Sequence, residues 1–276
     1  MIIIAETLVL GTIVFLILLS SLIYWLESRR PGFERPSNFD RRLHSVVNIK
    51  AGLVALVATA AANACVFVVA HLAESREFGL VGLIYSRAPG LPRGVNLVAG
   101  LFALDYSNYW IHRVQHLNPL LWRFHRVHHT DPAIDVTSGM RFHPFESFFR
   151  GGCQSIIVIT LGLSARSLEV YLWVQTAVLV WSHANLRIGP IESAGPLALV
   201  VGPAMHQRHH DITRKRHDSN YGIVLACWDW LHRSHSGRQS NFSIKQGLPD
   251  ASEVSQTLFG ILFEPFRRPA DGSVKF

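Results

Sequence analysis

Long uncharged stretches separate short basic segments along the first half of the chain. Residues 8–26 contain no charged side chain, and residues 51–73 form a second uncharged run. Each run is long enough to cross the hydrocarbon core of a bilayer as a helix, which takes about 20 apolar residues. The first run is expected to be a membrane anchor, because no positive charge precedes it and no small-residue cleavage site of a secretory leader follows it.

Three further apolar runs follow. One begins near Gly94 and leads through Asp105 into a histidine-rich stretch. The other two, residues 151–165 and 170–186, are separated by Arg166, Ser167 and Glu169 and are short for straight spans. A helical hairpin that enters and leaves from the same side of the membrane fits both. Residues 74–93 between the second and third runs are expected to form a short external loop or an interfacial segment.

This pattern predicts an all-α protein, namely an integral membrane bundle of about four spanning or hairpin helices with a histidine-rich helical cap. We expect a single domain over residues 1–276. Within it, residues 1–104 would form the membrane anchor helices, residues 105–235 would carry the histidine motifs, and residues 236–276 would be a cytosolic tail with a short helix near 252–263.

The charge distribution predicts the orientation of the chain in the membrane. The formal net charge is +7, and six basic residues gather between the first two apolar runs, namely Arg29, Arg30, Arg35, Arg41, Arg42 and Lys50. Short loops rich in Lys and Arg stay on the cytoplasmic side, so the N-terminus is expected outside and the cap inside. Because the basic residues flank apolar spans, anionic lipid headgroups are the expected partners, and nucleic acid is not.

Histidines dominate the candidate chemistry. They occur as His112-x-x-x-His116 and as two His-x-x-His-His motifs, whose members are His125, His128, His129, His206, His209 and His210. Spacings of three and four place side chains on one face of a helix. Imidazole is a common protein ligand for iron, copper, zinc and nickel, and eight imidazoles suit two metal ions better than one tetrahedral zinc. The competing interpretation, a solvated basic face, would use Lys and Arg without repeating the motif.

His183 is expected to join these motifs as a ninth ligand. It stands at the end of the last apolar run, at the membrane face where the other motifs should gather. His44, in contrast, lies outside every motif and is expected to be dispensable for activity. The sequence assigns no role to His217, His232 or His235.

The motif set resembles that of the fatty acid hydroxylase and sterol desaturase superfamily of integral membrane oxygenases. The resemblance extends over roughly residues 105–229. Besides the histidine motifs it includes Leu121-Trp122, Arg141-Phe142-His143-Pro144-x-Glu146, His183-x-Asn185, Asn220-Tyr221-Gly222 and Trp228-Asp229. The chain departs from the family after Asp229, where the common Phe-Gly-Thr is replaced by Leu231-His232-Arg233.

The resemblance implies a bundle of about four membrane helices, capped by a cytosolic helical domain that holds two irons. It also implies O₂-dependent attack on a C–H bond of a fatty acyl, sterol or related membrane lipid. Side-chain acids and bases cannot break an unactivated C–H bond, so a metal or cofactor must carry that chemistry. Four residues are candidates for orienting the histidine ligands, namely Asp105, His143, Glu146 and Asp229.

Two classes of function remain open from the sequence. In an oxygenase, hydroxylation is favoured over desaturation with the same ligand set. The electrons would come from a separate reductase with a ferredoxin or small cytochrome, because the chain contains no flavin or nicotinamide fingerprint and no haem-binding domain. In a membrane metal-handling protein, such as a transporter, ligands would lie along a path near the bilayer midplane. The motifs here fall at membrane edges and in polar segments, which disfavours transport.

Overall fold

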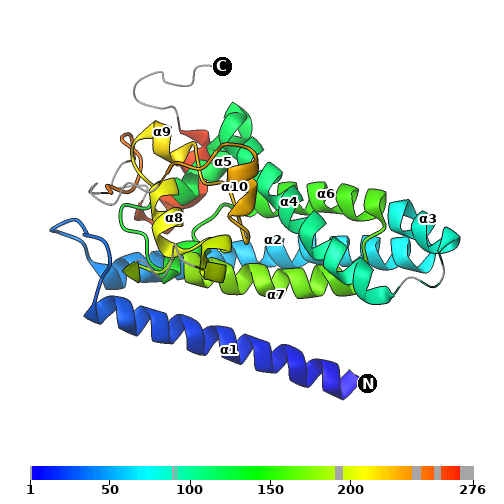
Figure 1. Ribbon diagram of the computed structural model, residues 1–276. Coiled ribbons are helices and arrows are strands. Elements are labelled where there is room, and N and C mark those ends of the chain that lie inside the picture. The colour runs from blue at the N-terminus through cyan, green and yellow to red at the C-terminus, as the bar shows by residue number, and fades with distance from the viewer. Residues whose placement is uncertain are drawn as a thin grey trace.

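The computed structural model describes residues 2–88, 90, 92–189, 195–237, 244–251 and 256–267. Over these residues the regular elements are helices, accompanied by two isolated β-bridges. The expectation of an all-α fold is therefore confirmed. In Figure 1, the long helices run side by side as an elongated bundle, and most of the shorter helices gather at one end of it as a cap.

The N-terminal half contains four helices, α1 (Ile2–Arg29), α2 (Arg41–Ser75), α3 (Gly79–Arg87) and α4 (Arg93–Leu117). The start of α2 corrects the sequence prediction, because Arg41, Arg42 and Lys50 lie in its first turns rather than in a loop. The Asp40 side chain accepts hydrogen bonds from the backbone N–H groups of Arg42 and Leu43 and so caps the helix before its apolar part begins. Within the segment expected to be a loop, α3 forms a short helix at the far end of the bundle (Figure 1).

The central region contains α5 (Pro119–His129), α6 (Pro144–Leu161) and α7 (Ala165–Ser182). The connection between α6 and α7 lies before Arg166 and Glu169, the charged residues that were expected to mark it. Gly162 adopts φ +70°, a left-handed conformation that glycine tolerates, and the Ser164 side chain accepts from Ser167 N to start α7. Arg166 therefore lies in the first turn of α7 and not in the connection.

The remaining elements are short and belong mostly to the cap. They are η1 (Val136–Met140), η3 (Gly195–Leu199), α8 (Pro203–His209), α9 (Arg214–His217), α10 (Cys227–Leu231), α11 (Leu258–Phe263) and η5 (Glu264–Phe266). The helix expected near 252–263 corresponds in its second half to α11, and residues 252–255 lie outside the described residues.

Helix α2 packs closely against α6 through small side chains. Its buried face carries Ala51, Ala55, Ala58, Ala62, Val66, Ala70 and Ala73, at spacings of three and four that follow one side of the helix, and all of these except Val66 are alanines. At Gly151 of α6, an added Cβ would lie 2.8 Å from the Ala62 Cβ. Small residues let helix backbones approach closely, and packing of this kind stabilises helix pairs where no water drives association.

A second core joins the four bundle helices to the cap. Its buried members are Val66, Ala70, Leu104, Val158, Leu163, Leu168, Tyr171 and Val224. The first seven lie on or beside α2, α4, α6 and α7, and Val224 precedes α10. This core fixes the segment that follows α9 onto the bundle.

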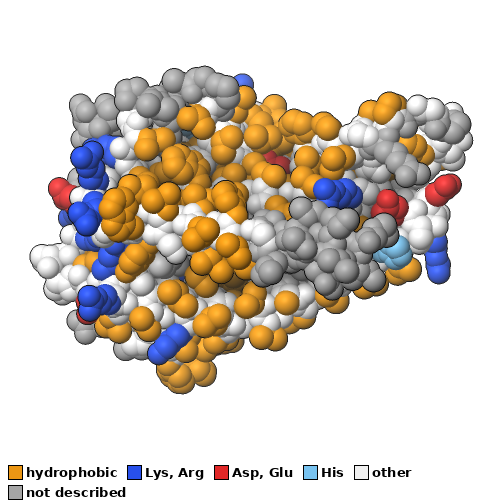
Figure 2. All heavy atoms as spheres, turned by 90° about the horizontal axis from the view of Figure 1, so that it is seen from below, with side chains coloured by type: hydrophobic (Ala, Val, Ile, Leu, Met, Phe, Trp, Pro, Cys, Tyr) orange, Lys and Arg blue, Asp and Glu red, His pale blue; other side chains and the backbone are white. Residues whose placement is uncertain are grey.

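The outside of the bundle is apolar. Figure 2 shows hydrophobic side chains spread over one face, with Lys and Arg side chains mainly at the cap end. Among the described residues, one helical segment, Arg41–Arg87, is long and apolar enough to cross a membrane.

The C-terminal segment, which was expected to be a tail, packs against α5. Arg126 of α5 forms ion pairs with Asp250 at 2.6 Å and with Glu264 at 3.0 Å. Ile261 of α11 is fully buried in a cluster with Val47 and Val127. This packing holds the outer side of α5, and α5 carries one of the two His-x-x-His-His motifs.

Candidate metal centre

All nine histidines predicted from the motifs lie buried where the cap meets the bundle. The end of α4 and the last turns of α5 supply five of them, α8 and the residue after it supply three, and His183 follows α7. Pro119 and Pro203 stand at the first positions of α5 and α8, where the fixed φ of proline suits a helix start. Two short helices, each begun by a proline, thus bring the repeated motifs face to face.

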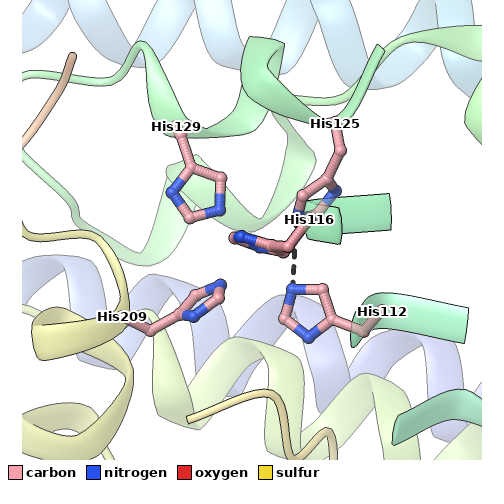
Figure 3. A group of neighbouring side chains, drawn as sticks. All are labelled: His112, His116, His125, His129 and His209. Atoms are coloured by element: carbon pink, nitrogen blue, oxygen red, sulfur yellow. Dashed lines mark hydrogen bonds between the residues drawn. The ribbon is translucent and has the colours of Figure 1, made fainter. Parts of the chain in front are cut away.

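The nine imidazoles form two compact groups. In the first group, one nitrogen from each of five residues lies within 4.8 Å of the others, and the members are His112, His116, His125, His129 and His209. Figure 3 shows their rings arranged around a common centre. The second group meets the same distance limit with four residues, His128, His183, His206 and His210.

The two groups are adjacent to each other. The rings of His129 and His210, one from each group, are stacked with centroids 4.4 Å apart. His128 and His129 are consecutive residues that serve different groups, as do His209 and His210. Each His-x-x-His-His motif therefore contributes to both groups, so that two ions bound there would be close neighbours, as in other dinuclear sites.

Backbone carbonyls determine which ring nitrogen is available in four of these residues, namely His112, His128, His209 and, as described below, His183. The Nδ1 atoms of His112, His128 and His209 lie 2.8, 3.1 and 2.7 Å from the carbonyl oxygens of Tyr221, Arg141 and Ser219. A carbonyl oxygen can only accept, so each Nδ1 carries the hydrogen. In the neutral ring, Nε2 is then an unprotonated acceptor that can bind a metal.

One contact between such nitrogens requires a cation to satisfy it. His183 donates through Nδ1 to the Leu179 carbonyl at 2.9 Å, and its Nε2 lies 3.1 Å from the Nε2 of His128. These two lone pairs, which face each other, cannot form a hydrogen bond, because neither nitrogen holds a proton to donate. In the first group, the Nε2 atoms of His112 and His125 are also 3.1 Å apart.

The required cation is not a proton. Burial lowers the pKa of His183 to about 4 and that of His209 to about 3, and it holds the pKa values of His128, His129, His206 and His210 well below the usual range. These rings are therefore neutral near pH 7, which is the form that binds metals. The neutral, buried, inward-facing donor sets fit a pair of transition-metal ions.

Other buried nitrogens in the two groups support this fit. Both ring nitrogens of His116, Nε2 of His129 and His209, and Nδ1 of His206 and His210 have no hydrogen-bond partner. A buried polar atom without a partner costs free energy, and a bound ion is one of the recognised explanations for such atoms. The all-imidazole set suits iron, copper, zinc or nickel.

The four residues expected to orient the ligands have different roles in the structure. The Nδ1 of His125 lies 3.3 Å from both carboxylate oxygens of Glu146. The Asp105 carboxylate contacts none of the nine rings. It accepts hydrogen bonds from Tyr171, from the Val224 and Leu225 backbone, and from the Trp228 indole. The expectation that Asp105 orients an imidazole is therefore wrong, and the residue instead ties α7 and α10 to α4.

Asp229 acts through the backbone rather than on a ring. Its carboxylate accepts hydrogen bonds from Tyr221 N at 2.8 Å and from Gly222 N at 2.7 Å. These bonds position the Tyr221 carbonyl, which accepts a hydrogen bond from His112 Nδ1. His143 caps α6, because its Nδ1 accepts from Phe145 N at 3.1 Å. It lies in neither histidine group.

A buried polar network next to the second group was not predicted from the sequence. The Nε2 of His44 lies 2.8 Å from Asp131, which also accepts from Ser138 at 2.7 Å. Arg141 is fully buried, donates to Thr130, and offers its carbonyl to His128. The expectation that His44 is dispensable for activity stays a prediction, although the ring is part of this buried network. In the sequence, Asp131 and Arg141 stand close after the first His-x-x-His-His motif, and their charges could have indicated a polar network. Their partners His44 and Asn48 lie on α2, far away in the sequence.

The three histidines without an assigned role lie outside both groups. His217 is stacked on Trp122, with ring centroids 5.4 Å apart, and Trp122 in turn lies against His116 and His129. His232 is stacked on Tyr106 and Tyr109 at the edge of α4. His235 lies near Trp230.

A cavity of about 240 Å³ opens onto both histidine groups from the side of the bundle. His112 and His125 of the first group line it, as do His128, His183 and His206 of the second. The rest of its wall comes chiefly from α2, α6 and α7. The centre therefore faces the interior of an apolar helical bundle.

The described part of the chain is helical and carries two adjacent, buried, all-imidazole groups, which is the ligand set expected of a histidine-rich metal centre. Residues 97–234 match the fatty acid hydroxylase family, and the chain belongs to that family. This match covers most of α4, the elements from α5 to α10 and every residue of the two histidine groups, whereas α11 and η5 lie outside it.

Several curated relatives are similar over part of the chain. Ornithine lipid hydroxylase OlsE of Rhizobium tropici is 29% identical over 181 residues, which cover 64% of this chain and 52% of that protein. Human alkylglycerol monooxygenase is 26% identical over 48% of this chain and 28% of its own length. Human lathosterol oxidase is 26% identical over 59% of this chain and 52% of its own length. The chain thus spans about half or less of these relatives, and no solved structure matches it.

Proposed function

We propose that this protein is a membrane-bound hydroxylase that uses two iron ions and O₂ to oxidise a C–H bond of a lipid. The observation that carries the proposal is the pair of adjacent histidine groups beside a cavity among apolar helices, in which the unprotonated Nε2 atoms of His128 and His183 face each other. Membership of the family and the names of the relatives, which include a lipid hydroxylase and a monooxygenase, support oxidation of a lipid.

The overall reaction defines what must reach the site. A C–H bond, O₂, two electrons and two protons would give C–OH and water, so one oxygen atom enters the lipid and the other is reduced. The bound irons would supply the activation of O₂, which zinc cannot supply because it has no redox chemistry. The electrons require an external one-electron carrier, for which we propose a reductase with a ferredoxin or small cytochrome.

The residues of the chain would hold and shield the two ions. The nine histidines would be the ligands, and the carbonyls of Tyr221, Arg141 and Ser219 would fix the ring orientation of three of them. Glu146 would do the same for His125 and would add negative charge close to one ion. Because all these rings are buried, bulk water is excluded from the site.

We further propose that α1, α2 and α4 cross the membrane and that α6 and α7 form a hairpin whose turn reaches the face opposite the cap. The apolar exterior of the bundle and the span-like segment Arg41–Arg87 support this arrangement. The basic residues between α1 and α2 lie at the cap end, which would place the cap on the cytoplasmic side. The lipid would then reach the cavity directly from the bilayer.

The test is product analysis under ¹⁸O₂. Protein reconstituted with iron and a reductase system is supplied with a membrane lipid extract, and products are identified by mass spectrometry. Wild type should yield a lipid that carries one ¹⁸O atom, and His128→Ala should lose turnover by several orders of magnitude. His71→Ala, an exposed residue of α2 outside both groups, is the matched control and should keep full activity. A product without ¹⁸O, or full activity in His128→Ala, would overturn the proposal. A product that has lost two hydrogens would indicate desaturation instead.

A further inference from the structure

Polar side chains line the cavity even though the surrounding bundle is apolar. On α6, Glu146, Arg150 and Gln154 follow one another at intervals of four residues and so share one face of the helix. Asn63 of α2 and Gln175 of α7 face the same cavity from the other helices. A hydrocarbon ligand could not form hydrogen bonds with these groups.

The polar groups retain unused hydrogen-bonding capacity. The Gln175 Oε1 atom is buried and has no partner. Arg150 donates from Nη2 to the Asn108 side chain at 2.9 Å, and its Nη1 is 3.9 Å from Glu146. A guanidinium has five N–H donors, so these contacts leave donors available to a ligand. A buried polar group that stays unpaired when a ligand binds lowers the affinity for that ligand.

The size of the cavity limits how much of a lipid it can hold. A cavity of about 240 Å³ holds a segment of a membrane lipid rather than the whole molecule, and a segment bound there lies beside both histidine groups. The chemistry of the remaining walls therefore decides which segment of the lipid lies beside the metal site.

We propose that this cavity binds a polar linkage of the lipid that both donates and accepts hydrogen bonds, such as an amide, or a hydroxyl beside an ester or ether. The carbon presented to the metal site then lies within a few bonds of that linkage and not at the distant end of an acyl chain. Gln175 accepts the donor of the linkage, and Arg150 donates to its oxygen. This inference rests on the proposed function, since it names the substrate class of the same site.

A series of three probes of nearly equal shape tests the binding. N-methylpalmitamide has a donor and an acceptor, methyl palmitate has an acceptor only, and octadecane has neither. Each competes with a radiolabelled N-methylpalmitamide for the purified full-length chain in detergent, without reductant, so that no turnover takes place. Each affinity is referred to the measured concentration of the probe in the micelles, so that differences in partitioning between probes cancel.

Wild type should bind the amide more tightly than the ester, and the ester more tightly than the alkane. Gln175→Leu, which removes the acceptor at similar size, should weaken binding of the amide about three- to tenfold, the range expected for one hydrogen bond, and leave the alkane unaffected. Arg150→Met should reduce the advantage of the ester over the alkane by a similar factor. Val174→Leu, on the exposed side of α7, is the matched control and should change none of the affinities.

Equal affinity of wild type for all three probes, or unchanged selectivity in both Gln175→Leu and Arg150→Met, would overturn the inference. The binding assay needs no oxidation, so its outcome is independent of the ¹⁸O₂ test. Absence of ¹⁸O product together with selective amide binding would reject the hydroxylase proposal and keep the binding site. Label found far from the polar linkage in a turned-over lipid would keep the hydroxylase and reject the inference.

Discussion

At the residue scale, the hydrogen-bond acceptors behind the histidines determine what the site can bind. The Nε2 atoms of His128 and His183 face each other without a proton, because the Nδ1 atom of each ring carries the hydrogen and donates it in a hydrogen bond to a backbone carbonyl. Such a pair is destabilising in the absence of a cation and favourable in its presence. The backbone carbonyls thus select the tautomer that binds a metal through Nε2. In the other tautomer, one ring could donate a hydrogen bond to its neighbour.

Metal content should fall by one ion when either group loses a ligand. We expect about two metal ions per wild-type chain and about one in both His116→Ala and His206→Ala, because these residues belong to different groups. The double variant should retain almost none. The measurement is elemental analysis of protein purified without oxygen. His71→Ala serves again as the control, and two ions per chain in both single variants would contradict the assignment of the groups.

The ligands themselves could be predicted from the sequence, because helical spacing brings residues three and four apart onto one face. The acceptors behind them could not, because they are mainly backbone carbonyls or residues far away along the chain. Tyr221 is remote from His112, and His44 is remote from Asp131, so no local pattern connects them. Asp105 was misassigned for the same reason, since its four donors come from α7 and from the segment that leads into α10.

At the element scale, the close approach of α2 and α6 forms a wall of the cavity. Gly151 faces Ala62 on α2, whereas the next residue, Gly152, has no neighbouring atom within 4 Å of an added Cβ. The apolar run 151–165 predicted a helix from the sequence but did not reveal this difference. Two adjacent glycines look equivalent until the partner helix is known.

These two glycines make a matched pair of substitutions. In Gly151→Ala the new Cβ would lie 2.8 Å from the Ala62 Cβ, so the helices must move apart. We expect a loss of roughly 1–3 kcal/mol in stability, as for other overpacked cores. Gly152→Ala should be neutral or stabilise the helix by up to about 1 kcal/mol. Thermal unfolding in detergent compares the two variants, and equal midpoints would argue against the close packing.

The ends of the elements differ from the sequence pattern because caps, and not hydropathy, set them. Asp40 starts α2 within a basic segment, and Gly162 with Ser164 places the turn between α6 and α7 before the first charged residue. Apolar length alone predicts that helices exist. It does not determine where each one begins, since polar first turns can extend beyond an apolar run.

At the scale of the whole molecule, cysteine labelling tests the orientation. Arg214 in the cap and Arg166 at the opposite end of α7 have side chains that are 79% and 66% exposed. With the cap on the cytoplasmic side, Arg214→Cys should react with an impermeant maleimide only after the membrane is opened, whereas Arg166→Cys should react in intact cells. Wild type reports the background from the native cysteines, and the reverse pattern would invert the topology.

The two histidine groups also connect distant parts of the chain. Each draws ligands from the middle of the sequence and from α8, so a bound ion closes a long loop between them. When a metal closes such a loop, the free energy of metal binding stabilises the folded chain. The cap would be stabilised most, because the bundle has its own apolar core. A chain inserted in the membrane without the proposed irons would keep its bundle folded, while its cap would be less stable and accessible to proteases. The supply of iron would then determine how much of the protein persists.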